Sequence, residues 1–139
     1  MIEISTDQEQ LDIDLIHRFL SEESYWANGI PLDLVERSIE NSLCFGAYEG
    51  GRQVGFARVI TDYATFGYIA DVFVVGSHRG QGIARQVMSA IKDHPDLQRL
   101  RRWQLRTRDA HTLYAEFGFR ELEQPERYME IAVKNAYVS

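Results

Sequence analysis

The sequence predicts an α/β fold, a single domain over residues 1–139 in which a mixed central sheet of six to seven strands is flanked by about four helices. Three observations support this prediction. Four segments carry apolar residues at helical spacing, and short apolar or alternating runs lie between them. No repeat or Pro/Gly-rich linker interrupts the chain, and its 139 residues suffice for one domain with a core.

The expected elements follow one another in the order β-α-α-β-β-β-α-β-α-β-β. Strands are expected at 2–4, 43–48, 54–61, 68–75 and 103–107, with one or two more from residue 119 onward, especially at 128–133. Helices are expected at 8–20, 32–41, 81–92 and 110–117, the last with Asp109 as N-cap and Gly118 as C-cap. The three strands between 43 and 75 predict an antiparallel half, and the helix that follows them predicts a parallel crossover.

Composition limits the class of protein. Hydrophobic residues make up 45% of the chain and charged residues 26%, which is typical of globular proteins. No apolar run approaches the roughly 20 residues that span a bilayer, and residues 1–5 do not begin a secretory signal. We therefore expect a cytoplasmic protein with no membrane partner. Cys44, the only cysteine, excludes an internal disulfide and is expected to be a buried structural residue.

Charge is distributed unevenly along the chain. Residues 1–75 carry 4 Lys/Arg against 13 Asp/Glu, residues 76–108 carry 8 against 2, and residues 109–139 carry 3 against 6. A basic block in an acidic protein favours a polyanionic ligand on the block and a cationic substrate elsewhere, although both regions are equally compatible with solvated faces. The net charge of −6 argues against nucleic acid as a partner.

Segment 74–84 joins the expected buried strand to the helix at 81–92 and has the composition of an anion-binding loop. Small residues at 80, 82 and 84 allow backbone N–H groups to approach a ligand, and the helix N-terminus favours negative charge. Arg79 and Arg85 flank the loop. A dinucleotide fingerprint would require a small residue where Arg85 stands, and a nucleoside-triphosphate loop would require Gly-Lys-Ser/Thr.

Two motifs in this order resemble those of the GNAT N-acetyltransferase superfamily. Residues 79–84 (RGQGIA) resemble its Arg/Gln-x-x-Gly-x-Gly/Ala signature, and residues 110–119 (AHTLYAEFGF) resemble its Ala-x-x-Leu-Tyr-x-x-x-Gly-Phe segment. The order of elements from residue 1 to about 133 also fits. One position departs from the family pattern: Thr107 stands where the family often has an asparagine that contacts pantetheine.

The resemblance implies acetyl-coenzyme A as co-substrate. In the family, backbone groups of the strand before the loop bind the pantetheine arm as an added strand would, and the loop amides hold the pyrophosphate. The residues expected to contact the cofactor are Phe73, Val74, Arg79, Gly80, Gln81, Gly82, Ile83, Ala84 and Arg85. Family members are often dimers, so a homodimer is one expectation.

Two residues are candidates for catalysis. Tyr114 matches the family tyrosine that donates a proton to the departing sulfur, although it also lies in an apolar stripe typical of a core. Asp71 is the one charge in an apolar strand. It is expected either to accept a proton from the substrate ammonium or bind that cation, or to pair with an arginine such as Arg58; the sequence does not separate these roles.

Tyr25 and Trp26 lie in the loop between the first two helices, which often walls the acceptor site in this family. They are candidate contacts for a cationic acceptor, and core-edge packing is the alternative. His78 and His111 have no second ligand at metal spacing, so no metal site is expected. The prediction is an acetyl-coenzyme A-dependent N-acetyltransferase that transfers acetyl to a primary amine of a small molecule, peptide or protein by direct attack in a ternary complex. The alternative is a non-catalytic coenzyme A-binding module that serves as a sensor or interaction partner.

Overall fold

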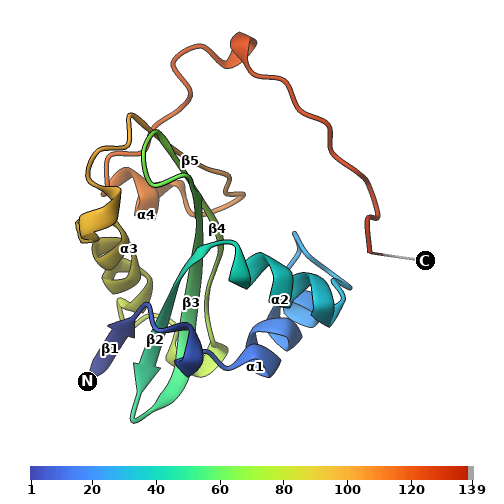
Figure 1. Ribbon diagram of the computed structural model, residues 1–139, viewed down its shortest axis with the longest axis vertical. Helices are drawn as coiled ribbons and strands as arrows, with labels where there is room; N and C mark the ends of the chain where they lie inside the picture. Colours follow the sequence, from blue (N-terminus) through green and yellow to red (C-terminus); the bar gives the residue numbers. More distant parts are fainter. Residues whose placement is uncertain (138–139) are drawn as a thin grey trace.

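The computed structural model describes residues 1–137 and contains a five-stranded mixed sheet in the order β1-β2-β3-β4-β5 (Figure 1). The strands are β1 (Ile2–Ser5), β2 (Leu43–Glu49), β3 (Arg52–Thr61), β4 (Phe66–Val74) and β5 (Arg102–Leu105). The first four strands pair antiparallel, and β5 pairs parallel with β4. The expected mixed α/β architecture is confirmed.

Four α-helices flank the sheet: α1 (Ile13–Arg18), α2 (Leu32–Glu40), α3 (Ile83–Asp93) and α4 (His111–Ala115). The helix expected at 8–20 is divided, because Asp12 accepts a hydrogen bond from the Leu15 N–H at 3.1 Å and starts α1 there, and a π-helical turn over Phe19–Glu23 follows. Asp109 is not the N-cap of α4. Ala110 occupies that position, and its N–H donates to the Thr107 hydroxyl at 3.0 Å.

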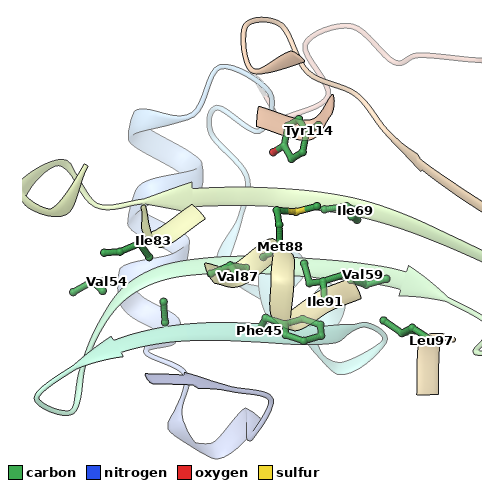
Figure 2. Close-up of a cluster of buried hydrophobic side chains, with 12 residues drawn as sticks. Phe45, Val54, Val59, Ile69, Ile83, Val87, Met88, Ile91, Leu97 and Tyr114 are labelled. Atoms are coloured by element: carbon green, nitrogen blue, oxygen red, sulfur yellow. The ribbon is translucent and has the colours of Figure 1, made fainter. Parts of the chain in front are cut away.

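Two clusters of buried side chains cover opposite faces of the sheet. On one face, α3 places Val87, Met88 and Ile91 against Phe45 of β2 and Val59 of β3 (Figure 2). On the other face, the side chains of α1, the π-helical turn and α2 pack on β2, β3 and β4; they include Ile16, Phe19, Leu20, Val35 and Ile39. Successive strand residues alternate between the two faces, so Cys44 belongs to the second cluster and Phe45 to the first.

β4 is paired differently on its two sides. Its pairing with β3 extends to Val74, whereas its pairing with β5 ends at Ile69 and Leu105. A β-bulge in the β3–β4 ladder lies opposite Ala57, and Asp71 within it adopts φ +57°. The two parallel strands therefore separate beyond residue 69, and one backbone edge of β4 is left open at 70–74.

The prediction of six to seven strands is wrong in its count. Within residues 1–137 no strand follows β5; beyond α4 the chain contains only a 3-10 turn at Pro125–Arg127, and the segment expected to be a strand at 128–133 is extended but unpaired. Figure 1 shows this C-terminal segment running away from the sheet. The sequence has the alternation of a strand, but a strand also requires a neighbour with which to pair.

Candidate active site

A cavity of about 850 Å³ lies where β4 and β5 separate. Its walls come from β4 and the end of β5, from the loop between α1 and α2, and from the first turn of α4. The predicted site residues Tyr25, Trp26, Asp71 and Tyr114 all line it. Thr107, which stands where the family often has an asparagine, lines it too. Four predicted residues from three distant segments of the sequence are therefore gathered around one opening.

The open edge of β4 supplies main-chain hydrogen-bonding groups beside this cavity. The Val75 N–H donates to the Val54 carbonyl of β3 at 2.9 Å, so by strand alternation the polar groups of Val74 face away from β3. The Val74 carbonyl accepts from Nε of Arg79 at 3.2 Å. The Phe73 side chain is not in the cavity wall, because it is buried and stacked on Phe19 with ring centroids 4.0 Å apart.

The glycine loop continues from this edge into α3. Gly80 and Gly82 have φ values of +78° and +77°, and a Cβ at either position would meet no atom within 4 Å. Glycine is therefore required here by backbone conformation and not by crowding. The first helical bond joins the Gln86 N–H to the Gly82 carbonyl at 3.1 Å, and no described side chain caps the helix. The N–H groups of residues 83–85 are thus unused by the helix and available to an anion.

The two arginines of the loop are held by other parts of the chain. Nε of Arg85 forms an ion pair with Glu116 at 2.8 Å, and a second nitrogen lies 3.3 Å from the other carboxylate oxygen. Arg79 donates to Val74 as described above. The loop histidine, His78, contacts Glu49 at 2.9 Å. The backbone N–H groups of the loop are therefore available to a phosphate, whereas the side chains of Arg79 and Arg85 already have hydrogen-bond partners within the protein.

Tyr114 is positioned by α4 at the inner wall of the cavity. Its side chain is buried, with 8% exposed, and packs edge-on against Phe119 with centroids 6.2 Å apart. Burial raises the pKa of Tyr114 above its ordinary value of 10, with smaller contributions in the same direction from Tyr25 and Asp109. The hydroxyl is therefore protonated at neutral pH and can act as a donor.

Asp71 has partners for both carboxylate oxygens. Nε of Arg58 donates to Oδ2 at 2.9 Å, and Nε1 of Trp26 donates to Oδ1 at 2.8 Å. The arginine pairing that the sequence left open is therefore formed. Because Asp71 also faces the cavity, its role toward a substrate amine stays a prediction.

Tyr25 and Trp26 form the outer wall, with their rings packed edge to face 5.0 Å apart. The Tyr25 hydroxyl accepts from the Arg108 N–H at 3.2 Å, and the Arg108 guanidinium lies over the Tyr25 ring at 3.9 Å. This cation–π contact ties the loop between α1 and α2 to the segment after β5, although 83 residues separate the two in the sequence.

Apart from Arg58, the arginines of this cavity were not predicted from the sequence. Arg37, Arg58, Arg106 and Arg108 line it, against Asp71 and Asp109 as its only carboxylates among the described residues. Of the 13 acidic residues in 1–75, only Asp71 reaches the wall. Arg106 and Arg108 belong to the basic block that the sequence indicated, but that block was assigned entirely to the cofactor.

The described residues form neither a metal site nor a membrane-spanning helix. Among residues 1–137, no three His, Cys, Asp or Glu side chains lie close enough together to hold a metal ion, and His111 begins α4 at an exposed position. Within the same range, every helix is too short or too polar to cross a bilayer.

Comparison with known proteins decides the family. The family model "Acetyltransferase (GNAT) domain" matches residues 40–121. The chain belongs to the GNAT acetyltransferase family. A candidate acetyltransferase of Gibberella zeae is 32% identical over 120 residues, covering 70% of this chain and 68% of the fungal protein.

Solved structures of GNAT proteins extend the comparison. The crystal structure of a candidate GNAT acetyltransferase from Xanthomonas campestris pv. campestris is 53% identical, covers 100% of this chain and 98% of its own, and superposes with a TM-score of 0.98. A candidate acetyltransferase from Clostridium acetobutylicum, solved with acetyl-CoA, is 17% identical, covers 95% of this chain and 96% of its own, and has a TM-score of 0.72. The second likeness concerns the fold alone.

Proposed function

We propose that this GNAT protein transfers an acetyl group from acetyl-coenzyme A to a primary amine of a small molecule, peptide or protein. The observation that carries the proposal is the continuity of three features: the unpaired edge of β4 at 70–74, the open N–H groups at the start of α3, and the protonated Tyr114 at the cavity wall. The edge suits an extended pantetheine arm, and the helix start suits a pyrophosphate. The Clostridium structure contains acetyl-CoA in the same fold, which supports this choice of co-substrate.

The residues divide the chemical work in a direct transfer within a ternary complex. The acceptor nitrogen forms a bond to the thioester carbonyl carbon, and the carbon–sulfur bond breaks. Before the attack the acceptor ammonium loses a proton to Asp71 or to water, so that the neutral amine is the nucleophile. Tyr114 donates its proton to the departing sulfur, and the second proton that the nitrogen loses as the amide forms passes to water, from which Tyr114 is reprotonated. Asp71 is oriented by hydrogen bonds from Arg58 and Trp26. The described site needs no covalent intermediate, because positioning and proton transfer supply the catalysis.

The arginines of the cavity indicate which charge the acceptor carries. Four guanidinium groups against two carboxylates make the wall cationic, and two of those arginines, Arg58 and Arg108, are already engaged with Asp71 and Tyr25. Arg37 has no carboxylate partner among the described residues, and Arg106 pairs only with the exposed Glu130 of the C-terminal segment, at 3.2 Å. These two arginines can therefore pair with a carboxylate or phosphate of the acceptor. We therefore propose an acceptor that carries an anionic group beside its amine, in place of the purely cationic acceptor that the charge of residues 1–75 suggested.

Calorimetric titration of the full chain with acetyl-coenzyme A tests the cofactor, with dephospho-coenzyme A and NAD as controls. Saturable binding of acetyl-coenzyme A in preference to NAD is expected, and absence of binding contradicts the proposal. A thiol-release assay then compares amino acids and amino-sugar phosphates with diamines and polyamines. Turnover with the anionic amines supports the acceptor class, turnover with polyamines alone refutes it, and binding without any turnover favours a non-catalytic coenzyme A-binding module.

A further inference from the structure

Asp71 reaches the candidate active site from a distorted part of β4. Among residues 1–137, the residues other than glycine with a positive φ are Tyr63, Asp71 and Asn135, and of these only Asp71 lies inside a strand. Aspartate tolerates this left-handed backbone better than most residues do. Such strain persists where the surrounding contacts fix the residue, and it is common at functional sites. The contacts that hold Asp71 therefore bear on what its carboxylate does.

Both carboxylate oxygens of Asp71 are already used within the protein. Oδ2 accepts a hydrogen bond from Nε of Arg58 at 2.9 Å, and Oδ1 accepts one from Nε1 of Trp26 at 2.8 Å. The Asp71 side chain is only 10% exposed, so little of the carboxylate is left for a further donor. The ammonium group of an acceptor can therefore bind Asp71 only by replacing one of these two partners.

The two partners of Asp71 differ in how easily they are replaced. Arg58 is charged and 15% exposed, and its Nη1 also donates to the Ser42 hydroxyl at 3.1 Å. Removing it would leave an unpaired carboxylate in a nearly buried position, which is strongly unfavourable. Trp26 is a neutral donor whose residue is 42% exposed. An ammonium adds to the hydrogen bond a full positive charge that the indole N–H lacks, so Trp26 is the replaceable partner.

The backbone on either side of Trp26 is held in place. The Ser24 hydroxyl donates to the Leu20 carbonyl at 2.7 Å and accepts from the Ala27 N–H at 3.0 Å. Ser24 and Ala27 are both buried. An exchange of partners at Asp71 thus needs only a rotation of the Trp26 side chain, which is a fast motion for an exposed residue.

We propose that Trp26 is the gate of the acceptor site: its indole N–H occupies the place on Asp71 that the ammonium group of the acceptor takes, and the acceptor enters by displacing it. The inference rests on the proposed function, because the displacing cation is the acceptor amine. The exchange favours a ligand that combines an N–H donor with a positive charge. A neutral donor has no advantage over the indole, and a quaternary ammonium has no N–H to donate. Trp26 and Asp71 thus select the amine, whereas Arg37 and Arg106 select the anionic group.

The side-chain N–H signals of the two tryptophans in an NMR spectrum test the exchange without acetyl-coenzyme A. Trp103 lines a different cavity and is the internal control, and Trp103→Phe assigns the two signals. Ethylammonium chloride should move the Trp26 signal upfield and saturably, since its proton loses the bond to the carboxylate. Tetramethylammonium chloride has the same charge and no N–H donor, and should leave the signal in place.

Asp71→Asn, with its fold checked by circular dichroism, is the matched variant for this titration. The neutral amide does not attract a cation, so the response to ethylammonium should be lost. A Trp26 signal that stays in place with ethylammonium in the wild-type chain, or that moves equally with the two salts, would overturn the proposal.

Trp26→Phe separates a gate from a merely supporting role, because it keeps an aromatic ring and removes the N–H. For an amine that the thiol-release assay identifies, kcat/KM should rise about tenfold through a lower KM, the lower end of what one hydrogen bond to a charged group contributes. If Trp26 only positions Asp71, kcat/KM falls instead and the gate is refuted. Absence of turnover with every amine contradicts the proposed function, and the NMR titration then decides the gate by itself.

Discussion

The two sides of β4 show how differently one strand can be used. Toward β3 the pairing is continuous to Val74, and the paired strands β1–β4 hold buried residues on both faces. Toward β5 the pairing covers only residues 66–69, and beyond it lie the cavity, the open β4 edge and the glycine loop. The buried packing is concentrated on the closed side, and the proposed binding site lies where the pairing stops. Substitutions on the two sides should therefore separate unfolding free energy from cofactor affinity and turnover.

The largest effect is expected on the closed side from Ile91→Ala. Ile91 is fully buried between α3 and the sheet (Figure 2), and truncating such a side chain costs about 2–5 kcal/mol in unfolding free energy because of the lost transfer energy and the remaining cavity. Urea denaturation at one fixed protein concentration measures the loss. Ile60→Ala, at a strand position that is 42% exposed, is the matched control and should change stability much less. Equal losses in the two variants would refute this assignment of the core.

On the open side, Tyr114→Phe should lower kcat by roughly 100-fold, since general acids contribute factors of that order. Acetyl-coenzyme A affinity and urea stability should hardly change, because the ring stays in place. Unaltered turnover would remove Tyr114 from the proton-donor role. The pH profile gives a second check: the raised pKa of Tyr114 keeps the donor protonated, so wild-type kcat should not fall between about pH 7 and 9.

Gly82→Val tests whether the glycine loop binds the pyrophosphate, and Gly51→Val is the control because Gly51 has a similar positive φ. Gly82 and Gly51 have φ values of +77° and +82°, and an added Cβ at either position meets no protein atom within 4 Å. Valine in this conformation costs of order 1–3 kcal/mol at both sites. Only Gly82→Val should also weaken acetyl-coenzyme A binding, by about tenfold or more, equivalent to about 1.4 kcal/mol. Equal affinity of the two folded variants would place the pyrophosphate elsewhere.

The sequence predicted the closed side better than the open one. Local patterns sufficed for α2 and α3 within two residues of their observed ends, because helix periodicity depends on near neighbours. Gly118 was expected to be the C-cap of the last helix, but α4 ends at Ala115 and its C-cap is Glu116. The strand pattern at 128–133 was recognised, but no residue within 1–137 pairs with it. Alternation predicts a strand, but whether a strand forms depends on a pairing partner, which local sequence does not specify.

The side-chain partners of the site were the least predictable part. Arg58 was considered as a partner of Asp71 because strand pairing brings neighbouring strands together. Arg108 and Tyr25 are 83 residues apart and Arg85 and Glu116 are 31 apart, so neither contact follows from local spacing. The same motif that located Arg85 at the loop suggested that it contacts phosphate, whereas the side chain pairs with Glu116 in this structure.

The Arg85–Glu116 pair leads to the smallest expected effect. Both side chains are about half exposed, so the pair contributes little to stability, and its main consequence is to keep a guanidinium away from the anion loop. Glu116→Gln should release Arg85 toward the pyrophosphate and tighten acetyl-coenzyme A binding by about two- to threefold, the range that surface ion pairs support. Glu49→Gln removes an equal charge beside His78 and leaves Arg85 paired, so it controls for net charge. If both variants tighten binding equally, charge alone is responsible. If Glu116→Gln weakens it, the ion pair orients the loop and does not compete with the cofactor.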